Sequence, residues 1–81
     1  MLEVKRMKQK LVLKNCVGYW RKQKGLTQAC LAKMIGTRRE TIQYIEKGDM
    51  HTTSIYFAML IAIALEKEIC ELWWFDMEDC K

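Results

Sequence analysis

Three glycines divide the middle of this chain into two short segments, and this spacing constrains the fold more than any other feature. The glycines are Gly25, Gly36 and Gly48. Both segments carry apolar residues at helical spacing, and glycine is the usual residue just past a helix C-terminus. We therefore expect one helix over residues 28–35, capped by Thr27, and another over residues 38–47. Two helices of about nine residues joined by one glycine-centred turn must cross at a steep angle.

The two expected helices have an inner and an outer face. The apolar residues that should fix the crossing angle form the inner faces: Cys30, Leu31, Met34, Ile35, Ile42 and Ile45. The outer face of the second helix keeps long side chains: Arg38, Arg39, Glu40, Gln43, Tyr44 and Lys47. Arginine can bond guanine through two hydrogen bonds, glutamine can bond adenine, and glutamate can accept from cytosine. The pattern is typical of a helix-turn-helix whose second helix enters the major groove of DNA.

The rest of the chain also favours helices, so the expected fold is all-α, with five helices in one compact domain. The chain has 81 residues and no proline, and its hydrophobic share of 51% suits a globular protein. A first helix is expected over residues 15–24, with Asn15 as its N-cap and Trp20 in the core. A fourth helix follows a cap at Thr53 or Ser54 and ends near residue 65 or 66.

The ends of the chain are less regular. A short fifth helix is expected over residues 69–75, followed by an acidic tail that frays. Near the other end, Val4, Met7 and Leu11 are spaced for a helix, while residues 10–14 equally suit a paired strand. We divide the chain into a basic arm over residues 1–14, a helix-turn-helix domain over residues 15–75 and an acidic tail over residues 76–81.

Charge is divided unevenly along the sequence. Residues 1–48 carry 12 Lys and Arg against three acidic residues, a net charge of +9, while residues 49–81 carry two against seven, a net charge of −5. A basic front half points toward nucleic acid or another anionic surface, and the alternative is a solvated surface on which charges happen to segregate. The basic arm likewise either follows a phosphate backbone or is a solvated extension.

Other classes of protein find little support. The four cysteines form no C-x-x-C pair, and the chain has one histidine, so we expect free thiols and neither a metal nor a cofactor. The charged start of the chain is unlike a signal peptide, which indicates a cytoplasmic protein. The apolar run over residues 55–65 is shorter than the roughly 20 residues that span a bilayer, and indicates a buried core helix. The sequence shows neither a catalytic triad nor a glycine-rich phosphate loop, so we expect neither an enzyme nor a small-molecule ligand.

The two central segments resemble a known family. The run Gly-Leu-Thr-Gln-Ala-Cys-Leu-Ala-Lys-Met-Ile-Gly over residues 25–36 is followed by Thr-Arg-Arg-Glu-Thr-Ile-Gln-Tyr-Ile-Glu-Lys-Gly over residues 37–48. Together they are similar to the phage repressor and Cro-type (xenobiotic-response-element, XRE) helix-turn-helix family, and the similarity covers about residues 13–73. The resemblance implies a lambda-repressor-like fold and a sequence-specific regulator of transcription that binds double-stranded DNA in the nucleoid, with repression as the simplest outcome.

The resemblance also implies roles for individual residues. Residues that would read base edges are Arg39, Glu40, Gln43 and Tyr44. Residues that would bind phosphate and position the recognition helix are Thr27, Gln28, Arg38 and Lys47. Arg21 and Glu46 resemble a partly buried ion pair that ties the first helix to the end of the third. One departure from the family is Arg38, which replaces the usual small polar cap of the third helix and shifts capping to Thr37.

An aromatic cluster near the end of the chain predicts an interface. Leu72, Trp73, Trp74 and Phe75 cannot all be buried within one short helix, so one or two of the rings should be exposed. We expect a homodimer contact at Trp73, Trp74 and Phe75, with simple core capping as the alternative. A two-fold dimer would hold two recognition helices about 34 Å apart and read a palindromic operator. The competing function is a protein-interaction module, such as an antitoxin or anti-repressor, that uses this aromatic face.

Overall fold

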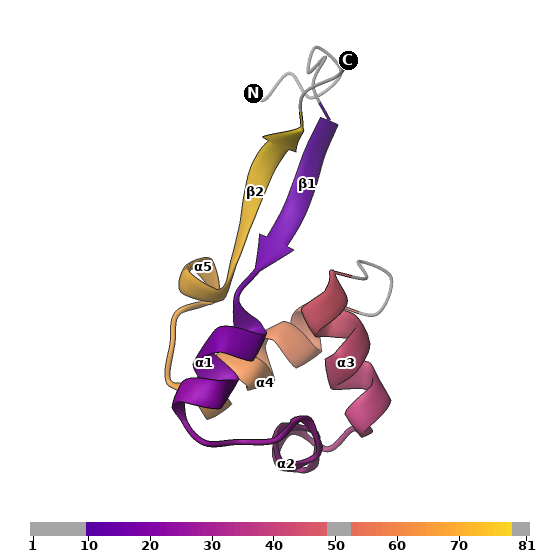
Figure 1. Cartoon of the computed structure of the whole chain (residues 1–81), viewed down its shortest axis with the longest axis vertical. Helices are drawn as coiled ribbons and strands as arrows, with labels where there is room; N and C mark the ends of the chain where they lie inside the picture. Colours follow the sequence, from indigo (N-terminus) through magenta and orange to yellow (C-terminus); the bar gives the residue numbers. More distant parts are fainter. Residues whose placement is uncertain (1–9, 49–52, 79–81) are drawn as a thin grey trace.

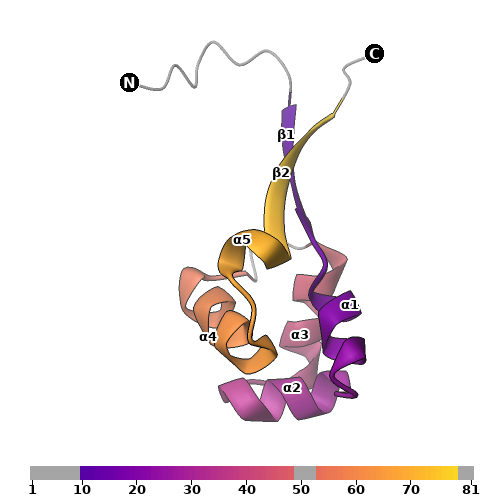
Figure 2. The same cartoon turned by 90° about the vertical axis from the view of Figure 1, so that its left-hand side faces the viewer.

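The computed structural model describes residues 10–48 and 53–78, and shows a helical body from which a two-stranded ribbon projects (Figure 1). The elements follow the order β1 (Lys10–Asn15), α1 (Val17–Gln23), α2 (Gln28–Ile35), α3 (Arg39–Lys47), α4 (Ile55–Leu65), α5 (Ile69–Leu72) and β2 (Trp73–Glu78). In Figure 2 the short α5 lies between the ribbon and α4. No helix within these described residues is long and apolar enough to cross a membrane.

The ends of α2, α3 and α4 lie close to where the sequence places them, but the N-cap expected at Asn15 is wrong, because Asn15 ends β1 and Cys16 is the N-cap residue of α1. Thr27 caps α2 with its hydroxyl, which accepts from the amide of Cys30 at 3.0 Å, and the predicted range of α2 is confirmed. Gly36 ends α2 with a φ of 79°, in the left-handed region that glycine adopts without a steric penalty. The cap of α4 is Ser54, one of the two expected residues. Helix α3 begins one residue later than expected, at Arg39.

The core joins all five helices. The largest fully buried side chains are Val17, Leu31, Ile42, Ile45, Ile61, Leu65 and Leu72. Trp20, expected in the core, is half-buried and packs against it. Two residues expected on the inner face of α2 are exposed instead, since Cys30 and Met34 lie on the solvent side of the helix. The prediction was wrong for them because α2 packs through a narrower stripe of Leu31, Ala32 and Ile35.

Helix α4 is apolar on every side but is buried on only one. Its inward residues are Ala58, Ile61, Ala62 and Leu65. Its outward residues are Ile55, Tyr56, Met59 and Ile63, each more than half exposed. The expectation of a buried core helix is therefore wrong for four of the eleven residues of α4, because the body covers a single face of it.

The all-α expectation is wrong for both ends of the described chain, which pair as an antiparallel ribbon. Leu13 lies opposite Phe75, and Lys14 lies opposite Trp74. The predicted fifth helix ends at Leu72 rather than at residue 75, because Trp73 has an extended backbone and opens β2.

The strand alternative for residues 10–14 is thus the correct one, and the predicted fraying of the acidic tail is wrong for residues 76–78, which belong to β2. Residues 1–9 and 79–81 lie outside the described residues. The division of the chain at residues 14 and 75 stays a prediction, and the two strands extend across both boundaries.

Candidate nucleic-acid interface

Helix α3 lies at the edge of the helical body (Figure 1), and its outward side is polar. Ile42 and Ile45 are completely buried and fix the rotation of the helix about its axis. The opposite side carries Arg39, Glu40, Tyr44 and Lys47 as exposed residues and Gln43 as a half-buried one. All four residues expected to read bases therefore share one accessible surface, while their role on DNA stays a prediction.

A buried ion pair holds this helix against α1. Arg21 Nε donates to Glu46 Oε2 at 2.6 Å, and a second guanidinium nitrogen donates to Glu46 Oε1 at 3.2 Å. Arg21 also donates to the carbonyl oxygen of Leu26 at 2.8 Å. The two charged side chains are only 9% and 14% exposed, so water screens them little. The pair therefore ties the C-terminal turn of α3 to α1 and to the loop before α2.

Gln28 extends this network from α2 toward the polar face. The Nε2 of Gln28 donates to Glu46 Oε1 at 2.9 Å, and this bond turns the Oε1 of Gln28 toward α3. Arg39 donates to that Oε1 at 3.5 Å and to Gln43 Oε1 at 3.4 Å. The structure thus brings Gln28, expected to bind phosphate, beside two residues expected to read bases.

Arg39 has an acidic neighbour as well. A guanidinium nitrogen of Arg39 lies 4.0 Å from Glu40 Oε2, and both side chains are more than half exposed. An exposed pair at this distance contributes little to stability. Arg39 is therefore held in place by several weak contacts that a DNA base or phosphate can replace.

Gly18 is a structural residue of this site that the sequence analysis missed. A Cβ added at Gly18 would lie 3.1 Å from Glu46 Oε1. Any side chain at this position of α1 would press on the carboxylate that anchors α3. Its signal in the sequence was a glycine inside an otherwise helical segment, one turn before Arg21.

The start of α3 lacks a conventional cap. Arg38 is the N-cap residue but makes no side-chain capping bond. The expected shift of capping to Thr37 is wrong, because Thr37 precedes the N-cap residue and its hydroxyl bonds the Thr41 hydroxyl at 3.0 Å rather than a backbone amide. Arg38 is exposed, so its guanidinium is accessible beside Arg39.

The N-terminus of α2 carries a thiol that the sequence analysis assigned to the core. Cys30 is exposed, and hydrogen bonding to Thr27 lowers the pKa of its thiol below the usual value. Both residues flank Gln28 on the first turn of α2. Among the described residues, no group of three His, Cys, Asp or Glu side chains is arranged to hold a metal ion.

The aromatic cluster is divided between the core and the surface. Trp73 is 8% exposed and belongs to the core, while Trp74 and Phe75 are 44% and 63% exposed. The expectation that one or two rings remain exposed is confirmed. Because successive residues of a strand point to opposite faces, Phe75 shares one face of the ribbon with Leu13, and Trp74 shares the other with Lys14.

Comparison with known proteins identifies relatives over the helical body. A family model described as helix-turn-helix matches residues 17–72. Two relatives, both described as uncharacterized HTH-type transcriptional regulators, come from Archaeoglobus fulgidus. One is 42% identical over 60 residues, which cover 74% of this chain and 84% of the relative. The other is 41% identical over 54 residues, which cover 67% of this chain and 75% of the relative.

Proposed function

Because this chain belongs to the Cro-type helix-turn-helix family and is a DNA-binding transcriptional regulator, we propose that it reads an operator with the exposed face of α3. The observation that carries this proposal is the single accessible face formed by Arg39, Glu40, Gln43 and Tyr44. These side chains match the donors and acceptors of base edges in the major groove. The buried Arg21–Glu46 pair supports the proposal, since it holds the helix rigidly from behind.

We assign the phosphate contacts to residues that surround this face. Thr27 and Gln28 lie at the N-terminus of α2, where backbone amides and the helix dipole favour an anion. Arg38 and Lys47 lie at the two ends of α3 and bring positive charge to either side of the groove. Such contacts add affinity for any DNA sequence and weaken with salt. Glu40 would repel phosphate, so it contributes selectivity at some loss of affinity.

The ribbon supports a homodimer. A two-stranded ribbon alone in water is only marginally stable, and this one exposes Phe75 beside Leu13 on one face. A second copy that packs its ribbon on this face would cover both residues. The interface would then include Phe75 directly, whereas Trp74 points to the opposite face of the ribbon and Trp73 is buried in the core. A two-fold dimer reads a palindrome, with half-sites about 34 Å apart.

The simplest consequence of operator binding is repression by blocking a promoter, with the protein located at the nucleoid. A second candidate function remains, because exposed Trp74 and Phe75 suit a protein partner equally well. In that case the chain would act as an antitoxin or anti-repressor module. The two functions differ in whether a specific DNA motif exists.

Selection of bound sequences from a random duplex pool, at low and near-physiological salt, tests the proposal. We expect a palindromic motif with half-sites about one helical turn apart that persists at the higher salt. A variant with Arg39→Ala and Gln43→Ala serves as the matched control and should lose the motif. Binding that yields no motif and disappears with salt would contradict the operator-reading role and favour the protein-interaction module.

A further inference from the structure

The outward side of α4 forms an apolar surface that continues into a pocket. We call Ile55, Tyr56, Met59 and Ile63 the α4 face; each of these side chains is more than half exposed. They span two turns of the helix on one side, as a binding stripe would. At its C-terminal end the face opens into a pocket of about 430 Å³ between α4 and α5. A volume of this order accommodates one or two large side chains of a partner.

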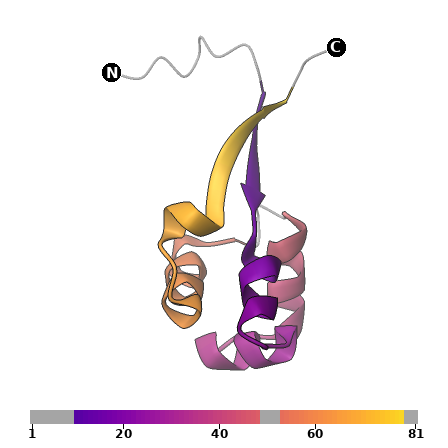
Figure 3. The same ribbon diagram turned by 60° about the vertical axis from the view of Figure 1, so that its left-hand side comes forward.

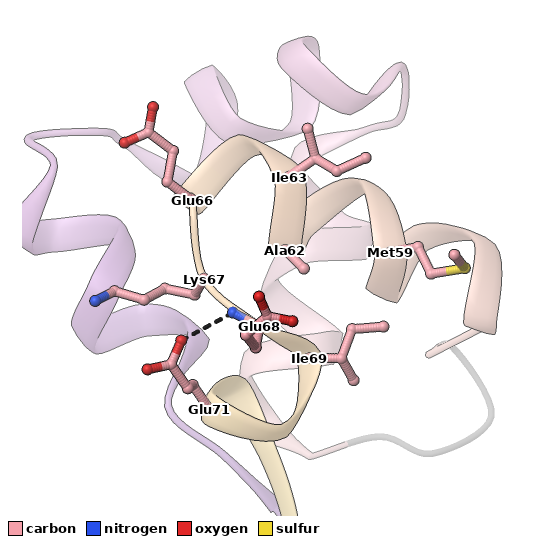
Figure 4. A pocket seen from close by; sticks show the side chains of 8 residues that line it. All are labelled: Met59, Ala62, Ile63, Glu66, Lys67, Glu68, Ile69 and Glu71. Carbon is pink, nitrogen blue, oxygen red and sulfur yellow. Dashed lines mark hydrogen bonds between the residues drawn. The ribbon is translucent and has the colours of Figure 1, made fainter.

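The pocket is apolar on one side and acidic on the other. In Figure 4, Met59, Ile63 and Ile69 lie on one side, Glu66, Lys67 and Glu71 lie on the other, and Ala62 and Glu68 lie between them. Glu66, Glu68 and Glu71 are all exposed. The pocket therefore combines an apolar lining with three carboxylates at its rim.

The lysines near the rim neutralise only part of its charge. Lys67 lies over the ring of Trp20, with its Nζ 3.7 Å from the ring centroid, and so turns toward α1. Lys24 reaches Glu66 at 2.9 Å, and this contact lowers the pKa of the Glu66 carboxyl. Glu68 and Glu71 bond backbone amides at the start of α5, which holds both side chains in place. The negative charge of the rim is thus concentrated in the ordered pair Glu68 and Glu71.

We propose that the α4 face and its pocket bind an amphipathic, basic segment of a partner protein. The apolar side chains of such a segment would fill the pocket and cover Met59 and Ile63. Its lysines or arginines would meet the carboxylates of Glu68 and Glu71. Apolar anchors flanked by complementary charge are the usual chemistry of a helix bound in a groove.

The charge of the rim argues against two other occupants. DNA would bring phosphates against three carboxylates. A second copy related by a two-fold axis through the pocket would bring the same carboxylates face to face, and this repulsion disfavours the pairing. Another arrangement of two copies would direct the basic α2–α3 surface of one copy into the pocket of the next and form an open chain of molecules.

The position of the α4 face allows DNA and the partner to bind together. In Figure 3, α3 and α4 lie on opposite sides of the helical body. A segment bound along α4 therefore leaves the polar face of α3 accessible. Simultaneous binding rests on the proposed function, under which α3 contacts the operator. Binding of the segment to α4 does not depend on that function.

Fluorescence anisotropy with the full chain and a synthetic peptide tests the proposal. The probe is a labelled helical peptide of about 18 residues, or five turns, with leucine at i, i+3, i+4 and i+7 and lysine on both flanks. A matched peptide replaces every lysine by glutamate. We expect the lysine peptide to bind at least tenfold more tightly than the glutamate peptide, and to bind equally well when the chain is on operator DNA.

Variants locate the bound peptide. Ile63→Ser should weaken binding about tenfold, since it removes an exposed apolar contact. The double variant Glu68→Gln and Glu71→Gln keeps side chains that suit a capping box and should also weaken binding. Met34→Ser changes an equally accessible apolar side chain on α2 and should have no effect.

Four results would overturn the proposal. Equal affinity for both peptides would remove the role of the acidic rim, and unchanged binding by Ile63→Ser would place the peptide elsewhere. Dissociation of a dimer by Ile63→Ser in sedimentation would show that a second copy covers the face. Stronger peptide binding after charge reversal at Lys5, Arg6 and Lys8 would show that the chain's own basic segment occupies it. Loss of peptide binding only in the presence of operator would instead contradict the simultaneous binding of DNA and partner.

Discussion

Glu46 is the residue through which three helices are connected. It accepts hydrogen bonds from Arg21 of α1 and Gln28 of α2, and it lies on the last turn of α3. Replacing it by glutamine leaves the buried Arg21 without a counter-ion. We expect Glu46→Gln to lower the free energy of unfolding by about 3 kcal/mol, as measured by urea denaturation.

Glu66→Gln is the matched control for this substitution. Glu66 also pairs with a basic residue, Lys24, but the carboxylate is exposed to solvent. Its removal should leave the urea midpoint unchanged within error. Equal loss of stability in the two variants would mean that the contribution of the Arg21–Glu46 pair to the free energy of unfolding does not depend on its burial.

A substitution at Arg39 distinguishes recognition of a base sequence from general attraction to DNA. In the free protein it contacts Gln28 and Gln43, both at the polar face. If Arg39 bonds a base, Arg39→Ala should cost about 1–3 kcal/mol of discrimination on the selected operator. Binding to random DNA should fall much less, as measured by titration with both duplexes. Equal losses on both would make Arg39 a phosphate contact.

The ends of α2 were predicted correctly because they depend on residues within one helix turn. Burial was predicted less well, because it depends on which helices pack against each face. Thr27 and Gly36 were placed correctly, because caps depend on their immediate neighbours. Cys30 and Met34 were misplaced, because apolar spacing alone does not show how wide a stripe the neighbouring helices cover. Arg21 and Glu46 are 25 residues apart, and their pairing came from the family resemblance rather than from local pattern.

At the scale of an element, the N-cap position of α3 carries a positive charge but makes no capping hydrogen bond. Arg38 occupies the N-cap without bonding the turn, where serine would accept from a backbone amide. We expect Arg38→Ser to raise the free energy of unfolding by roughly 1 kcal/mol and to weaken binding to every DNA sequence.

Arg38→Ala is the control for that experiment, because it removes the charge without adding a cap. It should weaken DNA binding to the same degree and leave thermal stability near that of the parent. If Arg38→Ser and Arg38→Ala have the same melting temperature, the start of α3 is already satisfied by other groups.

The ribbon shows what sequence pattern does not reveal about elements. Residues 69–75 are apolar and aromatic enough for a helix, and α5 does form over the first four of them. The strand that follows depends on pairing between Trp73 and Asn15, which lie far apart in the chain. The amide of Cys16 also donates to the carbonyl of Leu72 at 2.9 Å, at the base of the ribbon. Such non-local pairing decides between helix and strand for short apolar runs.

At the scale of the whole molecule, the proposed homodimer depends on the ribbon. Phe75→Asp places a charge on its apolar face, opposite Leu13. If two ribbons pack through this face, the variant should sediment as a monomer and bind a half-site while losing affinity for the full palindrome.

Met34→Asp is the control for the dimer, since Met34 is similarly exposed but lies on α2. It should leave the sedimentation coefficient unchanged. A monomeric parent chain, or a dimer that tolerates Phe75→Asp, would exclude the ribbon face as the contact.

The ribbon also fixes the order in which the molecule can be completed during synthesis. Its strands flank the helical body in the sequence, so β2 leaves the ribosome after all five helices. The helices depend mostly on nearby partners and can pack first, whereas β1 must wait for a strand almost sixty residues downstream, and such distant pairing is slow to form. The helix that we propose to read DNA can therefore form before the ribbon does, and the proposed assembly through the ribbon would be a step that follows translation.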